Sequence, residues 1–182
     1  MTGQAVAMPA TLEGPVDDPA SRLGILFDTH HQRLFRLASR LARSVDDAHD
    51  LVQETFLRAA RSPGSIPFGA ASEEAWLVRV LVNICRDGWR ASAVRRRAVD
   101  DGTVIPDAPG HPESALIARK VVHQALQKLP PRRRAILVLY ELDGTPVKEI
   151  AAMLRMNAVT VRWHLSVGRR EMARLLGDGR AS

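Results

Sequence analysis

The segment 145–176 constrains the fold of this chain most, because its apolar residues have the spacing of two helices joined by a tight turn. Apolar residues recur at intervals of three and four between positions 147 and 154, which predicts a short amphipathic helix. Thr145 is expected to cap this helix, with Pro146 as its first residue. A break at residues 155–157 follows, and the apolar period then resumes in a second helix. The pattern is typical of a helix-turn-helix.

Two helices that cross steeply over a tight turn need a small residue where they touch and a branched apolar residue beneath the second helix. Ala151 and Val161 occupy these two positions. The second helix can then lie in a DNA major groove, where Arg162 can make a bidentate contact with guanine and Arg169 and Arg170 lie near phosphates. The alternative is an ordinary helical hairpin whose basic face is only solvated.

Positive charge is concentrated in the same part of the chain. From Ser114 to the end there are 13 lysines and arginines against 5 aspartates and glutamates, whereas the first 113 residues have 13 against 15. This distribution favours a polyanionic partner for the C-terminal part.

The composition favours an ordinary water-soluble protein, with 46% hydrophobic and 25% charged residues in a chain of 182. No apolar run has the length of a membrane span, and the N-terminus does not have the pattern of a signal peptide, so we expect a cytoplasmic protein without a membrane partner. The single cysteine, Cys85, excludes an intrachain disulfide and a cysteine-rich zinc site.

The first part of the chain predicts a tail followed by two helices. Residues 1–22 have no helical period and are expected to be flexible, whereas an apolar stripe begins at Leu23 and includes His30 as a core histidine. Ser44 is placed to cap the next helix. The exposed side of that helix carries Asp47, Asp50, Gln53 and Glu54. Capping explains some of these acids, but the remaining ridge suits a basic protein partner.

A loop and a long helix follow. The loop 62–72 is rich in glycine and proline, yet it contains the apolar residues Ile66 and Phe68. These either pack under the domain or remain exposed to bind a partner such as an unstacked base. The helix, expected at about 73–97, should bury Trp76, Leu77, Val80, Leu81 and Ile84. Its other face carries Arg79, Asn83, Arg86 and Arg90, with Trp89 and an arginine run beyond. This face suits single-stranded DNA, or it is a solvated arginine face with Trp89 packed inward.

The remaining segments complete a second domain. Residues 99–113 are polar and contain proline, which predicts a flexible linker. Two further helices between Ser114 and Asp143 should pack under the helix-turn-helix. We therefore predict an all-α protein with two small helical domains, at 23–98 and 114–178, the second containing the helix-turn-helix.

The order of these parts resembles the extracytoplasmic-function class of bacterial RNA polymerase sigma factors over about residues 23–177. The polymerase-binding helix of the family resembles the segment DDAHDLVQETFLRA. Its promoter-melting helix resembles AWLVRVLVNICRDGWRASAVRRR, and its DNA-reading domain resembles LPPRRRAILVLYELDGTPVKEIAAMLRMNAVTVRWHL. The resemblance implies two partners, core RNA polymerase and promoter DNA. An anti-sigma factor is a further possible partner, since family members often have such an inhibitor.

Carried over by position, the resemblance assigns Asp47, Asp50, Gln53 and Glu54 to the polymerase contact. It assigns Ile66, Phe68, Asn83, Arg86 and Arg90 to the minus-ten promoter element. It assigns Thr160, Arg162, Trp163 and Ser166 to the minus-thirty-five element, with Val167 beside them.

Several positions depart from the pattern of the family. Glycine is common in the turn, where Arg155 stands, so we expect this turn to be built in another way. Val159 replaces a common glycine, Trp163 a small hydroxyl residue, His164 an arginine and Val167 a frequent cation. These changes leave the fold assignment in place but affect the promoter sequence that is read.

The expected mechanism is noncatalytic, with no metal and no cofactor, because no phosphate-binding glycine loop and no nucleophile beside a base is found. Two other functions compete with a sigma factor. One is a dimeric helix-turn-helix repressor or activator of duplex DNA, and the other is a helical enzyme whose basic face recruits a nucleotide. The acidic helix and the apolar loop argue for the sigma factor, because a dimeric repressor has no use for either.

Overall fold

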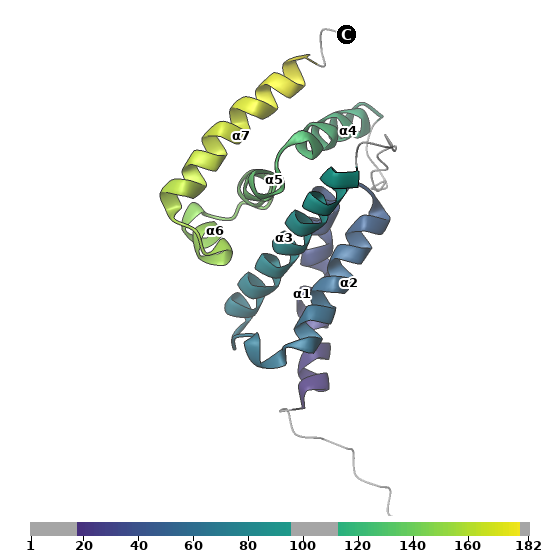
Figure 1. The fold of residues 1–182 in the computed structure, drawn as a ribbon, viewed down its shortest axis with the longest axis vertical. Coiled ribbons are helices and arrows are strands. Elements are labelled where there is room, and N and C mark those ends of the chain that lie inside the picture. Colours follow the sequence, from purple (N-terminus) through teal and green to yellow (C-terminus); the bar gives the residue numbers. More distant parts are fainter. Residues whose placement is uncertain (1–17, 96–112, 179–182) are drawn as a thin grey trace, which may run out of the picture.

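The computed structural model describes residues 18–95 and 113–178, and all regular elements of these residues are helical (Figure 1). The first region contains α1 (Pro19–Leu41), α2 (Val45–Arg61), a short 3-10 turn (Pro63–Ser65) and α3 (Ala70–Arg95). The second contains α4 (Glu113–Lys128), α5 (Pro131–Leu137), a π-helical turn η2 (Val138–Leu142), α6 (Val147–Leu154) and α7 (Ala158–Asp178). The prediction of an all-α fold with a helix-turn-helix is confirmed.

The predicted tail and linker fall mostly outside the described residues. Where they overlap with them, helix begins earlier than we expected: α1 starts at Pro19 and α4 at Glu113. Pro19 suits the first turn of a helix, and the Asp18 side chain accepts a hydrogen bond from the Ser21 backbone N–H.

The first region is a three-helix bundle whose packing follows the apolar stripes of its helices. Helix α1 buries Leu26, His30, Leu34, Leu37, Ala38 and Leu41. As predicted, the Ser44 hydroxyl caps α2, accepting a hydrogen bond of 3.0 Å from the Asp47 N–H. His30 is 4% exposed, which agrees with a core histidine.

Helix α3 is buried on a different set of positions from the one that we expected. Leu77 and Leu81 are fully buried as predicted, but Trp76, Val80 and Ile84 are only half-buried. Val78 and Val82 are instead buried, with exposed fractions of 0% and 4%. The second region packs against this side of α3 through α5 and α6, which explains the difference.

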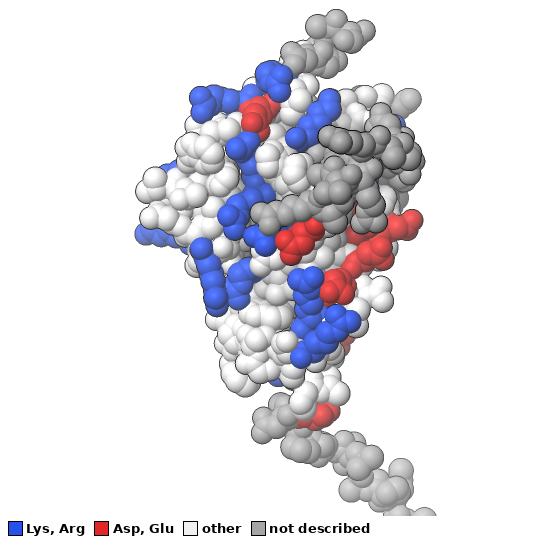
Figure 2. All heavy atoms as spheres, viewed as in Figure 1, with Lys and Arg blue, Asp and Glu red and all other residues white. Residues whose placement is uncertain are grey.

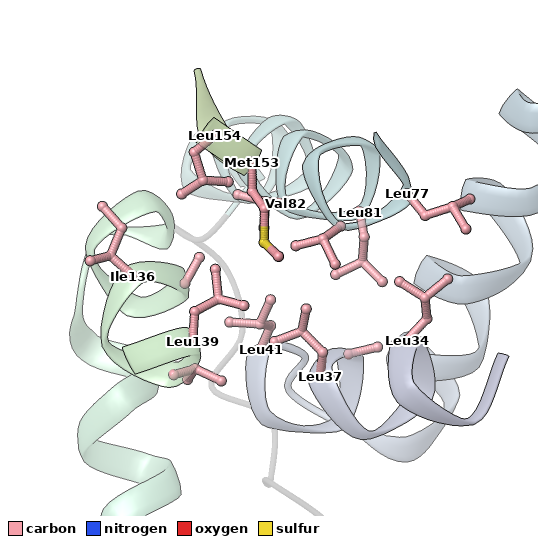
Figure 3. Packing of buried hydrophobic residues seen from close by; sticks show 14 of the residues in the cluster. Leu34, Leu37, Leu41, Leu77, Leu81, Val82, Ile136, Leu139, Met153 and Leu154 are labelled. Carbon is pink, nitrogen blue, oxygen red and sulfur yellow. The ribbon is translucent and has the colours of Figure 1, made fainter. Parts of the chain in front are cut away.

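The two regions share one hydrophobic cluster. Leu41 of α1 and Val82 of α3 point toward Leu139 of η2 and toward Met153 and Leu154 of α6 (Figure 3). In this structure the helix-turn-helix therefore lies against the first region.

A set of polar side chains from the second region covers the C-terminal end of α1. Gln127 donates to the carbonyl oxygens of Leu41 and Ala42, at 3.3 and 2.6 Å. His123 Nε2 lies 3.0 Å from the Ala42 oxygen. The guanidinium of Arg134 donates to the Leu41 oxygen at 2.6 Å. The last carbonyls of a helix have no partner within it, so these contacts satisfy groups that the docking would otherwise bury unpaired.

Helices α5 and α7 approach each other closely at Gly168. A Cβ atom built there would lie 2.7 Å from Leu137 Cδ1 and 3.1 Å from Arg133 Cγ, whereas a Cβ at Gly88 would meet nothing within 4 Å. We expect Gly168→Ala to lower the free energy of unfolding by about 1–3 kcal/mol through overpacking. Gly88→Ala, also in a helix, should raise it by up to about 1 kcal/mol. Urea unfolding checks both, and equal effects of the two substitutions would contradict the packing.

His123 makes the stability depend on pH. Burial lowers the pKa of His123, and the positive charge of Arg134 lowers it further. The hydrogen bond to the Ala42 carbonyl acts in the opposite direction but is smaller than the effect of burial. Because the unfolded chain then binds a proton more readily than the folded chain, stability should fall as the pH drops below about 6.5. Urea unfolding at pH 7.5 and 5.5 should show a smaller loss on acidification for His123→Gln than for the wild type. An unchanged pH dependence in the variant would exclude this role of His123.

Candidate nucleic-acid interface

Helices α6 and α7 form the predicted helix-turn-helix, and the structure shows how its turn is made. Arg155 has φ 50° and ψ 55°, in the left-handed region that glycine usually occupies. Its backbone N–H donates to Ala152, and the next N–H, of Met156, donates to Ala151 at 2.8 Å. Our expectation of a different kind of turn was wrong, because the ordinary turn geometry is kept and arginine adopts it.

The capping of these two helices also differs in part from the prediction. Pro146, not Thr145, is the cap residue of α6, and the buried Thr145 hydroxyl donates to Asp143 Oδ2 at 3.0 Å. Asn157 accepts a hydrogen bond from the Val159 N–H at 2.8 Å, which starts α7.

Replacing Arg155 by glycine should stabilise the protein. A left-handed residue with a Cβ costs about 1–2 kcal/mol, and glycine removes this cost while losing some chain entropy. We expect Arg155→Gly to raise the free energy of unfolding by about 1 kcal/mol. Ala152→Gly, in the interior of α6, is the matched control and should lower it by about 1 kcal/mol. Thermal or urea unfolding measures both, and a loss of stability in Arg155→Gly would contradict the assignment of strain.

The predicted reading residues lie together at the start of α7. Val161 and Leu165 are buried against the rest of the domain, with exposed fractions of 0% and 4%. All four side chains that we assigned to the minus-thirty-five element are exposed: Thr160, Arg162, Trp163 and Ser166. The start of the second helix can therefore enter a groove without unpacking the domain.

The charges divide over the surface as the sequence indicated. Figure 2 shows lysine and arginine side chains over much of the side formed by α5, α6 and α7, and acidic side chains gathered at the opposite side, where α2 lies. A second group of basic side chains lies next to these acidic ones, and the last turn of α2 carries the exposed Arg58 and Arg61. The basic side suits a polyanion and the acidic side suits a basic protein.

Three of the four predicted acidic-ridge residues lie around one hollow. Asp47, Asp50 and Glu54 line a hollow of about 340 Å³, together with Trp89 and Arg134 among others. Trp89 is half-buried there, which agrees with the alternative in which its ring packs inward. Gln53 is exposed on another side of α2 and lines a different hollow.

The predicted loop separates its two apolar residues. Ile66 is 4% exposed and belongs to the core, so it anchors the loop and is not available to touch a base. Phe68 is 82% exposed. Arg22 holds the loop by donating to the carbonyl oxygens of Ile66 and Pro67, and its guanidinium carbon lies 4.1 Å from the centre of the Phe68 ring. Sequence reasoning missed Arg22, which is far away in the chain.

The polar face of α3 lies beside the docked second region. Asn83 and Arg86 are half-buried, and Arg86 pairs with Asp87 at 3.2 Å. Burial lowers the pKa of Arg79, and the charge of Arg155 in the turn of the helix-turn-helix lowers it further. Arg90 is in α3, but its side chain lies outside the described residues.

Comparison with known proteins agrees with this arrangement. The family model "Sigma-70 region 2" matches residues 26–95, and "Sigma-70, region 4" matches residues 119–172. The ECF RNA polymerase sigma factor SigM of Mycobacterium tuberculosis is 35% identical over 153 residues, covering 84% of this chain and 76% of the relative. The chain belongs to the ECF class of RNA polymerase sigma factors.

Further relatives of this ECF sigma factor support the same assignment. SigE of Mycolicibacterium smegmatis is 33% identical over 176 residues, covering 94% of this chain and 63% of the relative. The solved sigma factor RpoE of Bartonella quintana, in complex with the anti-sigma factor NepR, has a TM-score of 0.64 and 21% identity, covering 87% of this chain and 96% of that one. At this identity the structural likeness concerns the fold.

As an ECF sigma factor, the protein directs RNA polymerase to specific promoters. The family and the function predicted from the sequence are thereby confirmed. Among the residues that the structure describes, no helix has the length and apolar character needed to cross a membrane.

Proposed function

We propose that this sigma factor binds core RNA polymerase through the acidic side of α2, and promoter DNA through α7 and through the face formed by the 62–72 loop and α3. The observation that carries this proposal is that the exposed acidic residues gather along the first turns of α2, whereas the side formed by α5–α7 is mainly basic (Figure 2). A protein that holds an enzyme and a DNA template at once needs two such surfaces. It would work in the cytoplasm and without catalysis of its own.

Asp47 and Asp50 are proposed as the main polymerase contacts. Both are exposed and border the hollow beside α3. Glu54 also borders it, but its carboxylate is shared with Arg58 at 3.0 Å and with Arg61 at 3.8 Å. Gln53 lies further around α2 and would contact the polymerase only at the edge of the interface.

Phe68 is proposed as the stacking residue for an unpaired base of the minus-ten element. An aromatic ring that is mostly exposed and covered on one face by a guanidinium offers its other face to a base. Asn83, Arg86 and Arg90 would follow the strand along α3. Ile66 supports the loop from below.

Binding of both promoter elements requires the two regions to separate. Elements centred about 25 base pairs apart are about 85 Å apart along B-form DNA. In this structure α6, which leads into α7, packs directly against α3. We therefore propose that the second region leaves α3 when the protein binds polymerase, which also uncovers the polar face of α3.

An anti-sigma factor is proposed as a further partner. Two solved structures of similar fold are complexes with a partner protein. RpoE is in complex with the anti-sigma factor NepR, and CnrH is in complex with the cytosolic domain of CnrY. The groove between α1 and α4, of about 580 Å³, has apolar walls and Arg36, Arg40 and Arg119 along it. An acidic amphipathic helix has the chemistry that fits such a groove.

A transcription assay tests the proposed function. Core polymerase with this protein should initiate at a promoter that core polymerase alone ignores. Genomic fragments from the source organism can serve as templates, with the start sites mapped from the transcripts. A dimeric repressor would instead reduce transcription that depends on another sigma factor and would give no new start sites.

A further inference from the structure

The geometry of α7 places an apolar pair, and not Arg162, at the centre of its exposed side. Successive residues of an α-helix are rotated by about 100°, so Val159 and Trp163 each lie about 160° from the buried Val161. Arg162 lies only about 100° from Val161, on the flank. Among residues 158–169 of α7, the two side chains that point most directly away from the domain core are therefore an aliphatic and an aromatic residue. Arg170 points the same way about two turns beyond Trp163.

Both side chains are accessible in the structure, and the Trp163 ring is also held in place by a neighbouring arginine. Val159 is 67% exposed and Trp163 is 54% exposed. The guanidinium carbon of Arg133 lies 5.7 Å from the centre of the Trp163 ring, and Arg133 is itself held by Glu171 through two contacts of 2.7 Å. The His164 ring also lies 4.9 Å from the Trp163 ring, centre to centre and edge-on, so the indole is held by two neighbours while more than half of it stays exposed.

The charges around this pair indicate what covers it. Lys148, Arg155, Arg162 and Arg170 are exposed on α6, on the turn and on α7. Cations that flank an apolar ridge at the start of a helix-turn-helix reading helix fit phosphates on either side of a major groove. The apolar group that DNA presents at the floor of the major groove is the 5-methyl group of thymine.

We propose that Val159 and Trp163 recognise thymine methyl groups in the upstream promoter element. The proposal rests on the proposed function of α7 and names the chemical group that this helix selects. Residues four apart are about 6 Å apart along a helix axis, close to two base-pair steps of about 3.4 Å each, so the two thymines lie within about two steps of each other. Arg162, on the flank of the helix, then adds affinity for the duplex without distinguishing thymine from uracil.

Thymine and uracil differ only by this methyl group, which allows a direct test. Holoenzyme reconstituted from core polymerase and the full chain is used to select duplexes from a random 30-base-pair library. The selected upstream duplex is then resynthesised with deoxyuridine at one thymine at a time, and the affinity of holoenzyme for each duplex is measured by fluorescence anisotropy at one salt concentration. One or two substitutions should weaken binding about fourfold each, the equivalent of about 0.8 kcal/mol per buried methyl group.

Matched variants assign the effect to the two residues. Val159→Ala should bind the thymine duplex more weakly and lose the response to uracil at one position, and Trp163→Ala should do the same at the other. Arg162→Ala should weaken binding to the thymine and uracil duplexes by the same factor and so keep the response. Both Val159 and Trp163 are exposed, so circular dichroism should show an unchanged fold.

The outcomes separate this inference from the proposed function. If holoenzyme selects a defined upstream sequence but no uracil substitution weakens binding, or if Val159→Ala and Trp163→Ala keep the full response, methyl recognition is excluded and promoter reading by α7 stands. If Trp163→Ala reduces binding to core polymerase and leaves the uracil response intact, Trp163 contacts a protein and the inference is overturned. If no upstream sequence is selected at all, both the inference and the proposed role of α7 fail.

Discussion

Asp50→Lys is expected to weaken binding to core RNA polymerase by about a hundredfold. Asp50 is exposed and lies on the acidic side of α2, beside Asp47 and Glu54. Placing a like charge against a basic partner costs several kcal/mol, and about 2.7 kcal/mol corresponds to a hundredfold. The affinity can be measured by titrating fluorescently labelled protein with core polymerase.

Asp28→Lys provides the matched control for this prediction. Asp28 is also an exposed helical aspartate, on α1, and its replacement changes the net charge by the same amount. It should leave the affinity for core polymerase within about twofold. If both variants bound equally well, or if both lost binding equally, the acidic side of α2 would not be a specific polymerase contact.

Arg134→Met is expected to lower the free energy of unfolding by about 2–4 kcal/mol. Arg134 is 2% exposed, and its guanidinium donates to the carbonyl oxygens of Leu41, Gln127 and Leu129 and to the Gln127 side chain. Methionine keeps an unbranched apolar stem but leaves these buried acceptors without the donor. Urea unfolding measures the loss.

Arg132→Met serves as the control for Arg134. Arg132 belongs to the same helix and is exposed, so its replacement should change stability by less than about 0.5 kcal/mol. Equal effects of the two substitutions would contradict the role of Arg134 at the end of α1.

The helices and the helix-turn-helix were predictable because they depend on local patterns. The apolar period that predicts α6 and α7, with the break at residues 155–157, is a property of neighbouring residues. The Ser44 cap of α2 is likewise local. The acidic side of α2 followed from the same period, since its charged residues recur on the side away from the core.

The contacts between the two regions were not predictable from local pattern. Val78 and Val82 are apolar residues in a helix that is apolar over a wide arc, and only the docking of α5 and α6 decides that they are buried. Arg134 is one of three consecutive arginines, and its burial depends on the carbonyl groups at the end of α1, some 90 residues earlier in the chain. No periodicity within either region carries this information.

The candidate site shows the same division. The exposure of four residues of α7 follows from helix periodicity: Thr160, Arg162, Trp163 and Ser166. In contrast, the burial of Ile66 and the exposure of Phe68 depend on how their loop packs. The left-handed conformation of Arg155 also escaped prediction, because arginine rarely adopts it and only the surrounding turn imposes it.

The proposed function requires that one chain binds both core RNA polymerase and promoter DNA. The decisive experiment is to titrate this protein, fluorescently labelled, with core polymerase that lacks any sigma factor. We predict saturable binding with one molecule of this protein per core enzyme, and a complex that then binds and opens a promoter duplex. Absence of binding to core polymerase, with duplex DNA bound by the protein alone, would show that the protein is a plain duplex-DNA binder and not a sigma factor.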